Sequence, residues 1–433
     1  MGHLTANGVY GELRRRLDKY PVGAPDSEQI YEILRLVFSE EEARLAAQMP
    51  MMPAGLKEIS RRTGLDAATL QTRLEAMADK GLILDFDMRG KKYFMLPPTV
   101  LGFFEFSMMR RREDLDQKRL AGLFHGVLMD GPDFSSQFEQ SESAPFRIRV
   151  HETALPEGTF TEILDYERAT VMVETARQWS VALCHCRHTA HHLGADCTKF
   201  KMESCLSLNG GAEWSTRHGL ARAIGKTEAL DLLAEARAHG LVYSGDNVQH
   251  QPTFVCLCCG CCCGVLAAFK KFRPAEPAFS SNFQADIDPA ACTGCGKCAK
   301  ACPVGVIDQL DSPHAVGERT FKKLSKVDAA MCLGCGVCHG ACQFGALAMK
   351  PRARRRITPE TAAKRILSHA IDQGKLQHLI LDDTQGFGLL AANRLLGAIL
   401  SLPPAKQLLA RQELKSRFVD RLLSRVKKSG VDV

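Results

Sequence analysis

Eight cysteines between residues 292 and 342 have the spacing of cluster ligands. They form two runs of the pattern C-x-x-C-x-x-C-x-x-x-C, namely Cys292, Cys295, Cys298 and Cys302, then Cys332, Cys335, Cys338 and Cys342. Three thiolates within seven residues reach three irons of one cube only if the backbone curls tightly around it, and the glycines between the cysteines permit that curl. The pattern therefore predicts two 4Fe-4S clusters.

The fourth cysteine of each run faces the other cluster in two-cluster ferredoxins, which this stretch resembles. That resemblance implies that one cluster is held by Cys292, Cys295, Cys298 and Cys342, and the other by Cys332, Cys335, Cys338 and Cys302. A proline follows the fourth cysteine of the first run, whereas Gln343 takes the equivalent place in the second. Proline is a turn device there and not a ligand, so the expected ligand sets do not depend on it.

Structural zinc and disulfide bonds are the alternatives for the same eight cysteines. Structural zinc sites usually take their four ligands as two separated pairs, so three closely spaced cysteines plus a fourth fit zinc poorly. Disulfide frameworks are typical of small secreted proteins, whereas this chain has 433 residues and begins without an apolar stretch of signal-peptide length. We therefore expect a cytoplasmic protein whose thiols stay reduced and free to hold metal. A peripheral position at the inner membrane is the alternative location.

Ten further cysteines lie upstream in two patches, which are Cys184, Cys186, Cys197 and Cys205, then Cys256, Cys258, Cys259, Cys261, Cys262 and Cys263. Free cysteine is usually scattered, so two dense patches predict that both converge on metal. Ten thiols suffice for two more cubes with two to spare, which makes up to four 4Fe-4S clusters in the chain. The spare thiols are open to structural, catalytic or unusual cluster roles, and the spacing leaves the partition among the ten undecided.

Imidazole and guanidinium side chains accompany the first of these patches. His185, His188, His191 and His192 lie there, and imidazole in place of a thiolate would raise a cluster's potential. Because thiolates are already plentiful, we expect these histidines to face solvent or to support the ligands instead. Arg187 is expected either to hydrogen-bond a ligand sulfur or to be an ordinary surface arginine.

The residues before the patches have helical patterning. We expect capped helices from Asp26 and from Ser39, then two helices separated by a glycine turn, and a hairpin around Arg89 and Gly90. This order resembles a winged helix over residues 26 to 97. A winged helix that binds DNA needs a basic face, but residues 1 to 110 contain fifteen Lys or Arg and fifteen Asp or Glu. We therefore expect a docking or packing module, with duplex binding as the alternative.

The C-terminal residues are basic and helical in pattern. Residues 350 to 433 contain seventeen Lys or Arg against seven Asp or Glu, while the whole chain has a net charge of +7. Such a tail suits docking on an acidic protein or an anionic membrane surface. The apolar stretch 386 to 404 is interrupted by Arg394 and is more typical of a packed helix, and no run of apolar residues is long enough to predict a transmembrane helix.

The composition, with 45% hydrophobic and 24% charged residues, is typical of a globular chain with several domains. We expect an α+β, multi-domain protein. Its predicted parts are an N-terminal arm (1–25), a winged-helix-like domain (26–110), a helical linker domain (111–180), a Cys-rich, mainly α domain (181–280), a two-cluster ferredoxin-like domain (281–350) and a basic helical tail (351–433).

The order of the cysteines between residues 184 and 350 resembles a family of bacterial multi-cluster ferredoxin-like proteins with a winged-helix front end. This resemblance covers most of residues 26 to 380 and implies electron carriage in anaerobic metabolism. The sequence has no G-x-G-x-x-G after a strand and no P-loop, so neither pattern of nucleotide site is present and electrons are expected to come from and go to partner redox proteins. A redox-sensing transcription regulator and a reductase whose central cluster binds a substrate are the alternatives.

Overall fold

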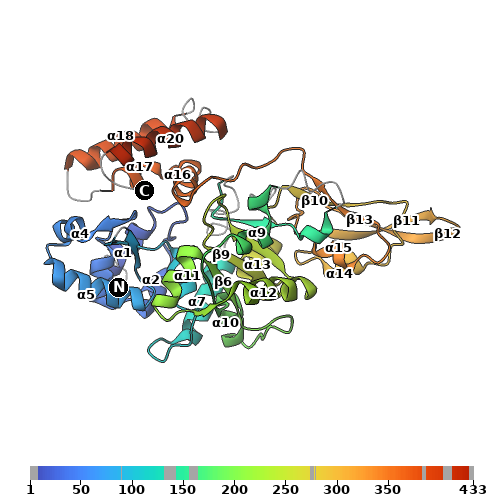
Figure 1. Ribbon diagram of the computed structural model, residues 1–433, viewed down its shortest axis with the longest axis horizontal. Coiled ribbons are helices and arrows are strands. Elements are labelled where there is room, and N and C mark those ends of the chain that lie inside the picture. The colour runs from blue at the N-terminus through green and yellow to red at the C-terminus, as the bar shows by residue number, and fades with distance from the viewer. Residues whose placement is uncertain are drawn as a thin grey trace. The chain divides into compact units, whose positions relative to one another are not determined.

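A computed structural model describes residues 8–88, 90–130, 143–155, 164–273, 277, 279–382, 387–402 and 412–428 (Figure 1). The chain divides into two compact units. Unit 1 contains residues 1–137, 214–222 and 359–433, and unit 2 contains residues 138–213 and 223–358. All eighteen cysteines belong to unit 2. The C-terminal tail thus belongs to the same unit as the N-terminal helices, while all the cysteines that could bind metal belong to the other unit.

Unit 1 begins with five helices, which are α1 (Val9–Leu17), α2 (Glu28–Val37), α3 (Glu40–Ala46), α4 (Leu56–Thr63) and α5 (Ala67–Asp79). The Ser27 hydroxyl accepts a hydrogen bond from the third residue of α2, one residue after the cap expected from the sequence. Ser39 and Glu42 form a reciprocal capping box at α3, which confirms the helix start predicted there.

A three-stranded sheet of order β1-β3-β2 follows these helices, with β1 (Ala54–Gly55), β2 (Leu84–Met88) and β3 (Lys91–Met95). Strands β2 and β3 pair antiparallel from Leu84 opposite Met95 to Met88 opposite Lys91, which confirms the predicted hairpin. Arg89, at its tip, lies outside the described residues. The helix and strand order of this part is the one expected from the sequence.

The rest of unit 1 is helical, apart from an irregular turn η1 (Thr99–Phe103), and comprises α6 (Phe104–Phe106), α7 (Gln117–Met129), α16 (Ala362–Asp372), α17 (Leu376–Ile380), α18 (Phe387–Ser401) and α20 (Gln412–Lys428). The Phe and Met side chains at 103 to 109 contribute Phe103, Phe104 and Met108 to the core. The loop expected after α7 falls mostly on residues 131 to 142, outside the described residues.

A buried ion pair fastens the tail to the N-terminal helices within unit 1. The Asp382 carboxylate, after α17, lies 2.5 Å from Nη1 of Arg16 and 3.2 Å from Nη1 of Arg62. The Arg16 and Arg62 side chains are almost fully buried, and Arg62 also pairs with Glu58 at 2.7 Å. The Asp382 carboxylate therefore supplies counter-charge to Arg16 and shares with Glu58 the counter-charge of Arg62.

Unit 2 is built on a six-stranded sheet of order β4-β8-β9-β6-β5-β7, with β4 (Phe146–Arg149), β5 (Trp179–Leu183), β6 (Glu203–Leu208), β7 (Arg222–Ile224), β8 (Val242–Asp246) and β9 (Phe254–Cys258). The mainly α character predicted for the Cys-rich domain is therefore wrong. The stretch FVCLC alternates in side-chain burial, and ESCLSL alternates over its first four residues, which is the period of a strand.

Helices accompany this sheet in unit 2, and they are α9 (Ala169–Glu174), α10 (His185–His192), α12 (Lys226–Ala238) and α13 (Gly264–Phe272), with short 3-10 turns η2 (Glu152–Ala154) and η4 (Asp165–Glu167). Helix α11 (Asn209–Arg217) begins in unit 2, and its residues from Trp214 on belong to unit 1. Met172 of α9 and Leu233 of α12 pack with Leu206 and Val255 of the sheet in one buried core. The end of the predicted helical linker domain is only partly helical, because α9 is followed by strand β5, whose sequence Trp-Ser-Val-Ala-Leu is richer in strand-forming residues.

The C-terminal part of unit 2 contains two similar halves. Each half has a cysteine loop and a short helix, α14 (Lys297–Ala301) or α15 (Val337–Ala341). Strands β10 (Phe283–Ile287) and β13 (Leu347–Pro351) pair antiparallel, and β11 (Ile307–Val316) and β12 (Arg319–Val327) form a long hairpin. Figure 1 shows this hairpin extending past the two short helices. In the part of the chain that the structure describes, no helix has the length and apolar character needed to cross a membrane.

Candidate metal centres

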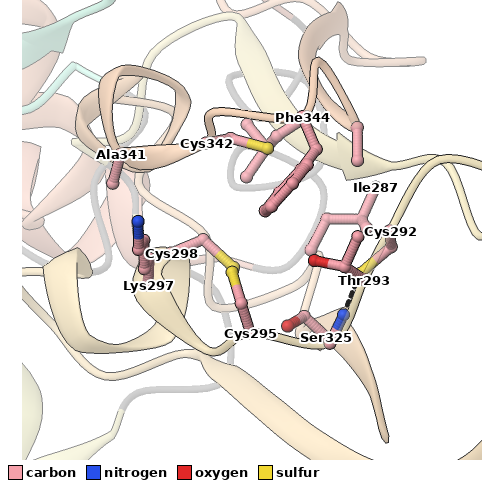
Figure 2. Close-up of a pocket in the computed structure, with 13 residues that line it drawn as sticks. Ile287, Cys292, Thr293, Cys295, Lys297, Cys298, Ser325, Ala341, Cys342 and Phe344 are labelled. Carbon is pink, nitrogen blue, oxygen red and sulfur yellow. Dashed lines mark hydrogen bonds between the residues drawn. The ribbon is translucent and has the colours of Figure 1, made fainter. Parts of the chain in front are cut away.

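Two cavities in the C-terminal part of unit 2 are lined by four thiols each. The first, of about 320 Å³, is lined by Cys292, Cys295, Cys298 and Cys342. The second, of about 330 Å³, is lined by Cys332, Cys335, Cys338 and Cys302. Figure 2 shows the four thiols of the first cavity around a common space, with the Phe344 ring beside them. The fold thus brings together the same two sets of four that the ferredoxin resemblance grouped.

The loop that carries each run is shaped by a glycine in a left-handed conformation. Gly294 has a φ of +64°, and its N–H donates to the Cys292 sulfur at 3.4 Å. Gly334 has a φ of +69° and donates to the Cys332 sulfur at the same distance. Further N–H groups of Ala285 and Val306 donate to cysteine sulfurs of the second cavity at 3.5 Å. Such bonds stabilise negative charge on sulfur and are one means of tuning a cluster's potential.

The lining of both cavities fits an iron–sulfur cluster. The Thr293 hydroxyl lines the first cavity and is buried without a hydrogen-bond partner among the described residues, so a sulfide or thiolate there would satisfy it. Burial raises the pKa of the Cys335 thiol to about 12, and it also raises the pKa of Cys338. Iron that binds these sulfurs would take the place of their protons, because the thiolate is the metal-binding form.

The ten upstream cysteines separate into two groups. We call Cys197, Cys259, Cys261 and Cys262 the outer group, because Cys261 is exposed. Their sulfur atoms all lie within 4.8 Å of one another, which among the described residues is true of this group of potential metal ligands alone. Cys197 comes from the segment between α10 and β6, and the other three come from the turn between β9 and α13.

The remaining thiols form an inner group, Cys184, Cys186, Cys205, Cys256, Cys258 and Cys263. Five of these thiols form a chain of contacts, in which each thiol contacts the next in the order Cys184, Cys186, Cys263, Cys258, Cys256. Cys205 lies directly opposite Cys256 in the pairing of β6 with β9. Contact with Cys186, together with burial, raises the pKa of Cys184 well above its ordinary value.

Two helix N-termini meet at the inner group. Cys184 is the N-cap of α10, and Cys263 is the N-cap of α13. The partial positive charge of a helix N-terminus stabilises thiolates and anionic clusters nearby. These two cysteines belong to different patches of the sequence, and the pairing of strands in the sheet brings the two patches together in space.

Arg187 lies between the two groups and is 1% exposed. Its Nε donates to the Cys197 sulfur at 3.4 Å, its Nη1 to the Ser204 hydroxyl at 2.6 Å, and its Nη2 to the Leu257 carbonyl at 2.8 Å. Burial of Cys197 would raise its pKa, but the Arg187 bond and two backbone N–H groups outweigh burial and lower it to about 6. The interpretation of Arg187 as a surface residue is therefore wrong, and the bond to a candidate ligand sulfur is observed.

The four histidines of the first patch stand beside the thiol groups. The exposed His191 pairs with Asp196 at 2.6 Å, and the His188 and His192 rings contact each other through their Nε2 atoms at 3.2 Å. None of the four belongs to the compact donor group at Cys197, as far as the described residues show.

Sequence reasoning missed the residues that join the second cavity to the sheet of unit 2. The backbone N–H of the buried His151 donates to the Cys335 carbonyl at 2.9 Å, and its ring Nε2 lies 2.8 Å from the Leu241 carbonyl. A Cβ atom on Gly260 would lie 2.6 Å from the carbonyl oxygen of Pro303, the residue after Cys302. Neither a lone histidine nor a glycine inside a cysteine run carries a sequence signal for such a contact.

The comparisons with known proteins bear on the C-terminal part of unit 2. Residues 291–346 match the family model of the 4Fe-4S dicluster domain. No curated protein and no solved structure matches the chain. The matched stretch contains all eight cysteines of the two cavities, and this part of the chain is accordingly a ferredoxin-like domain for two 4Fe-4S clusters.

Proposed function

We propose that the protein relays electrons between partner redox proteins through the two clusters of the ferredoxin-like domain and a third cluster held by the inner group. The observation that carries the proposal is the packing of Gly260 on Pro303. This contact brings the turn that follows Cys258 against the loop that carries Cys302, within one compact unit. Two sets of cluster ligands that are remote in sequence thereby come into backbone contact.

The exposure of the cavities indicates where a partner protein can exchange electrons with the chain. In the first cavity, Cys295 is exposed and Phe344 is 50% exposed, so a partner can approach closely. In the second cavity Cys332, Cys335 and Cys338 are all buried. The first cavity is therefore the place for exchange with a partner, and the second lies between it and the inner group.

A 4Fe-4S cluster bound in either cavity would exchange single electrons. The chain's own residues fix the potentials through amide–sulfur hydrogen bonds at Gly294 and Gly334 and through the apolar walls. His151, beside Cys335, contributes no positive charge near neutral pH, because burial lowers its pKa to about 4.

The N-terminal part of unit 1 serves as a docking module in this proposal, with the fold of a winged helix. What supports docking over DNA binding is that basic side chains around α5 already have acidic partners. Lys80 lies 2.7 Å from Glu42, and Lys92 bonds to Glu75. These pairs leave little positive charge for phosphates. The basic tail, with its excess of Lys and Arg, would favour an acidic protein partner.

Iron and acid-labile sulfide in the anaerobically purified full chain test the third cluster. We expect about twelve irons per chain, and about eight in Cys258→Ser, with the paramagnetic signals of the ferredoxin-like clusters unchanged. Ser207→Ala on strand β6 is the control and keeps all the iron. A wild-type protein with about eight irons would show that the inner group holds no cluster.

A further inference from the structure

The sulfur–sulfur distances of the outer group are those of a single tetrahedral ion. The Cys197 sulfur lies 3.7 Å from that of Cys259 and 3.9 Å from that of Cys261, and the Cys261 and Cys262 sulfurs are 3.6 Å apart. Zinc–thiolate bonds of about 2.3 Å give a tetrahedron whose sulfur–sulfur edges are about 3.8 Å. The three distances therefore match one ion at the centre of the group.

A cube requires a wider arrangement, because its four thiolates bind four different irons and point outward from separate corners. The ferredoxin-like domain gives the comparison within the same chain. Its two sets of four thiols each line a pocket and, among the described residues, neither set is drawn together within 4.8 Å as the outer group is. The outer group thus differs from these two sets in the spacing of its sulfur atoms, although the residue type is the same.

The outer group also lies where the fold needs a cross-link. The segment from Leu193 to Met202, between α10 and β6, has no helix or strand, and most of its side chains are exposed. Cys197 is at its middle and reaches the turn of Cys259 to Cys262. An ion bound to all four sulfurs would tie this segment to the turn that presents Gly260 to Pro303.

Charge compensation is in place for such an ion. Four thiolates around a divalent cation carry a net charge of about −2. The buried Arg187 guanidinium, with its bond to the Cys197 sulfur, offsets part of that charge.

We propose that Cys197, Cys259, Cys261 and Cys262 bind one zinc(II) ion in a closed, structural site. Four thiolates leave no open position for a substrate, and a sulfur tetrahedron suits zinc or iron. Zinc is the occupant that we propose, because such sites bind zinc(II) more tightly than iron(II). The site holds the turn around Gly260 in place and takes no electron itself. The inference stands apart from the proposed relay, since zinc content and electron transfer are measured separately.

Metal analysis of the anaerobically purified full chain tests the site. The cells that produce the protein are grown in a medium with equal concentrations of iron and zinc. We expect one zinc per chain, and X-ray absorption at the zinc edge showing four sulfur neighbours at about 2.3 Å. The absorption measurement uses the wild-type protein, so it does not depend on how a variant folds. Absence of zinc, or zinc with nitrogen or oxygen neighbours, would overturn the proposal.

Two variants locate the ion. Cys261→Ser, at the exposed member of the group, should lower zinc at least about tenfold while the iron content stays as in the wild type. Ser207→Ala, the control on β6 at a residue without a thiol, should keep its zinc. If Cys261→Ser instead loses about four irons, the outer group holds a cube, and if it loses one iron, the occupant is iron, and either result refutes the zinc site.

Discussion

Replacing Gly294 by alanine is the sharpest test of how the loop of the first cavity is built. The new Cβ would lie 1.8 Å from the Lys323 carbonyl oxygen and 2.5 Å from its carbon, both of which are backbone atoms of β12. The residue would also keep a φ of +64°, which costs an L-residue about 1 kcal/mol. Relieving the clash costs a further 1–3 kcal/mol or so, as for other overpacked sites.

Gly305→Ala is the matched control for this change. Gly305 has a φ of +66°, but a Cβ there meets no atom within 4 Å. It should therefore cost only the conformational term of about 1 kcal/mol. The difference between the two variants is the cost of the clash, about 1–3 kcal/mol, which corresponds to roughly a 5- to 150-fold change in the ratio of folded to unfolded loop.

The assay is iron and sulfide content with paramagnetic resonance of the reduced protein. We expect Gly294→Ala to lose about four irons and the signal of one ferredoxin-like cluster, and Gly305→Ala to keep all its iron. The remaining signals should be unchanged, because Gly294 lines the first cavity alone. Equal iron in the two variants, with equal stability towards denaturant, would refute the reasoning.

Three further predictions concern other parts of the chain. Arg187→Met should speed release of the outer group's ion to a chelator by about tenfold, because it removes a bond to a ligand sulfur; an unchanged rate would contradict this. Asp382→Asn should lower the free energy of unfolding of unit 1 by about 3 kcal/mol in chemical denaturation, since the buried Arg16 guanidinium loses its counter-charge while Arg62 keeps Glu58. Burial would lower the pKa of His218, but bonds to Asp85 and Asp79 outweigh burial and raise it. The stability that this histidine contributes is complete below about pH 6.5 and is lost as pH rises through the raised folded-state pKa, so His218→Gln should flatten the dependence measured between about pH 6 and 8.

The sequence was most informative where the chemistry is local. Each cysteine run of the ferredoxin-like domain occupies eleven residues, so its spacing predicts the cluster type. The crossing of Cys302 and Cys342 is what the resemblance to two-cluster ferredoxins implied. The helix start at Ser39 was predicted, and the start at Ser27 was predicted to within one residue, because a cap and its helix are neighbours in the chain.

The central part could not be predicted in the same way. Its thiols lie on strands β6 and β9 and at two helix N-termini, and pairing between distant strands decides which sulfurs meet. Cys258 and Cys259 are adjacent in sequence yet fall in different groups, because successive side chains of an extended backbone point in opposite directions. No spacing rule separates them before the sheet is known.

The most direct test of the relay is the movement of an electron through the wild-type chain. A bulky photoreductant should reduce the exposed cluster of the first cavity first, and freeze-quenched paramagnetic resonance can then follow the electron. We predict that the signal of the inner group's cluster appears later, at a rate that does not depend on protein concentration. An inner signal that never appears, or one whose rate rises with protein concentration, would contradict electron transfer within the chain.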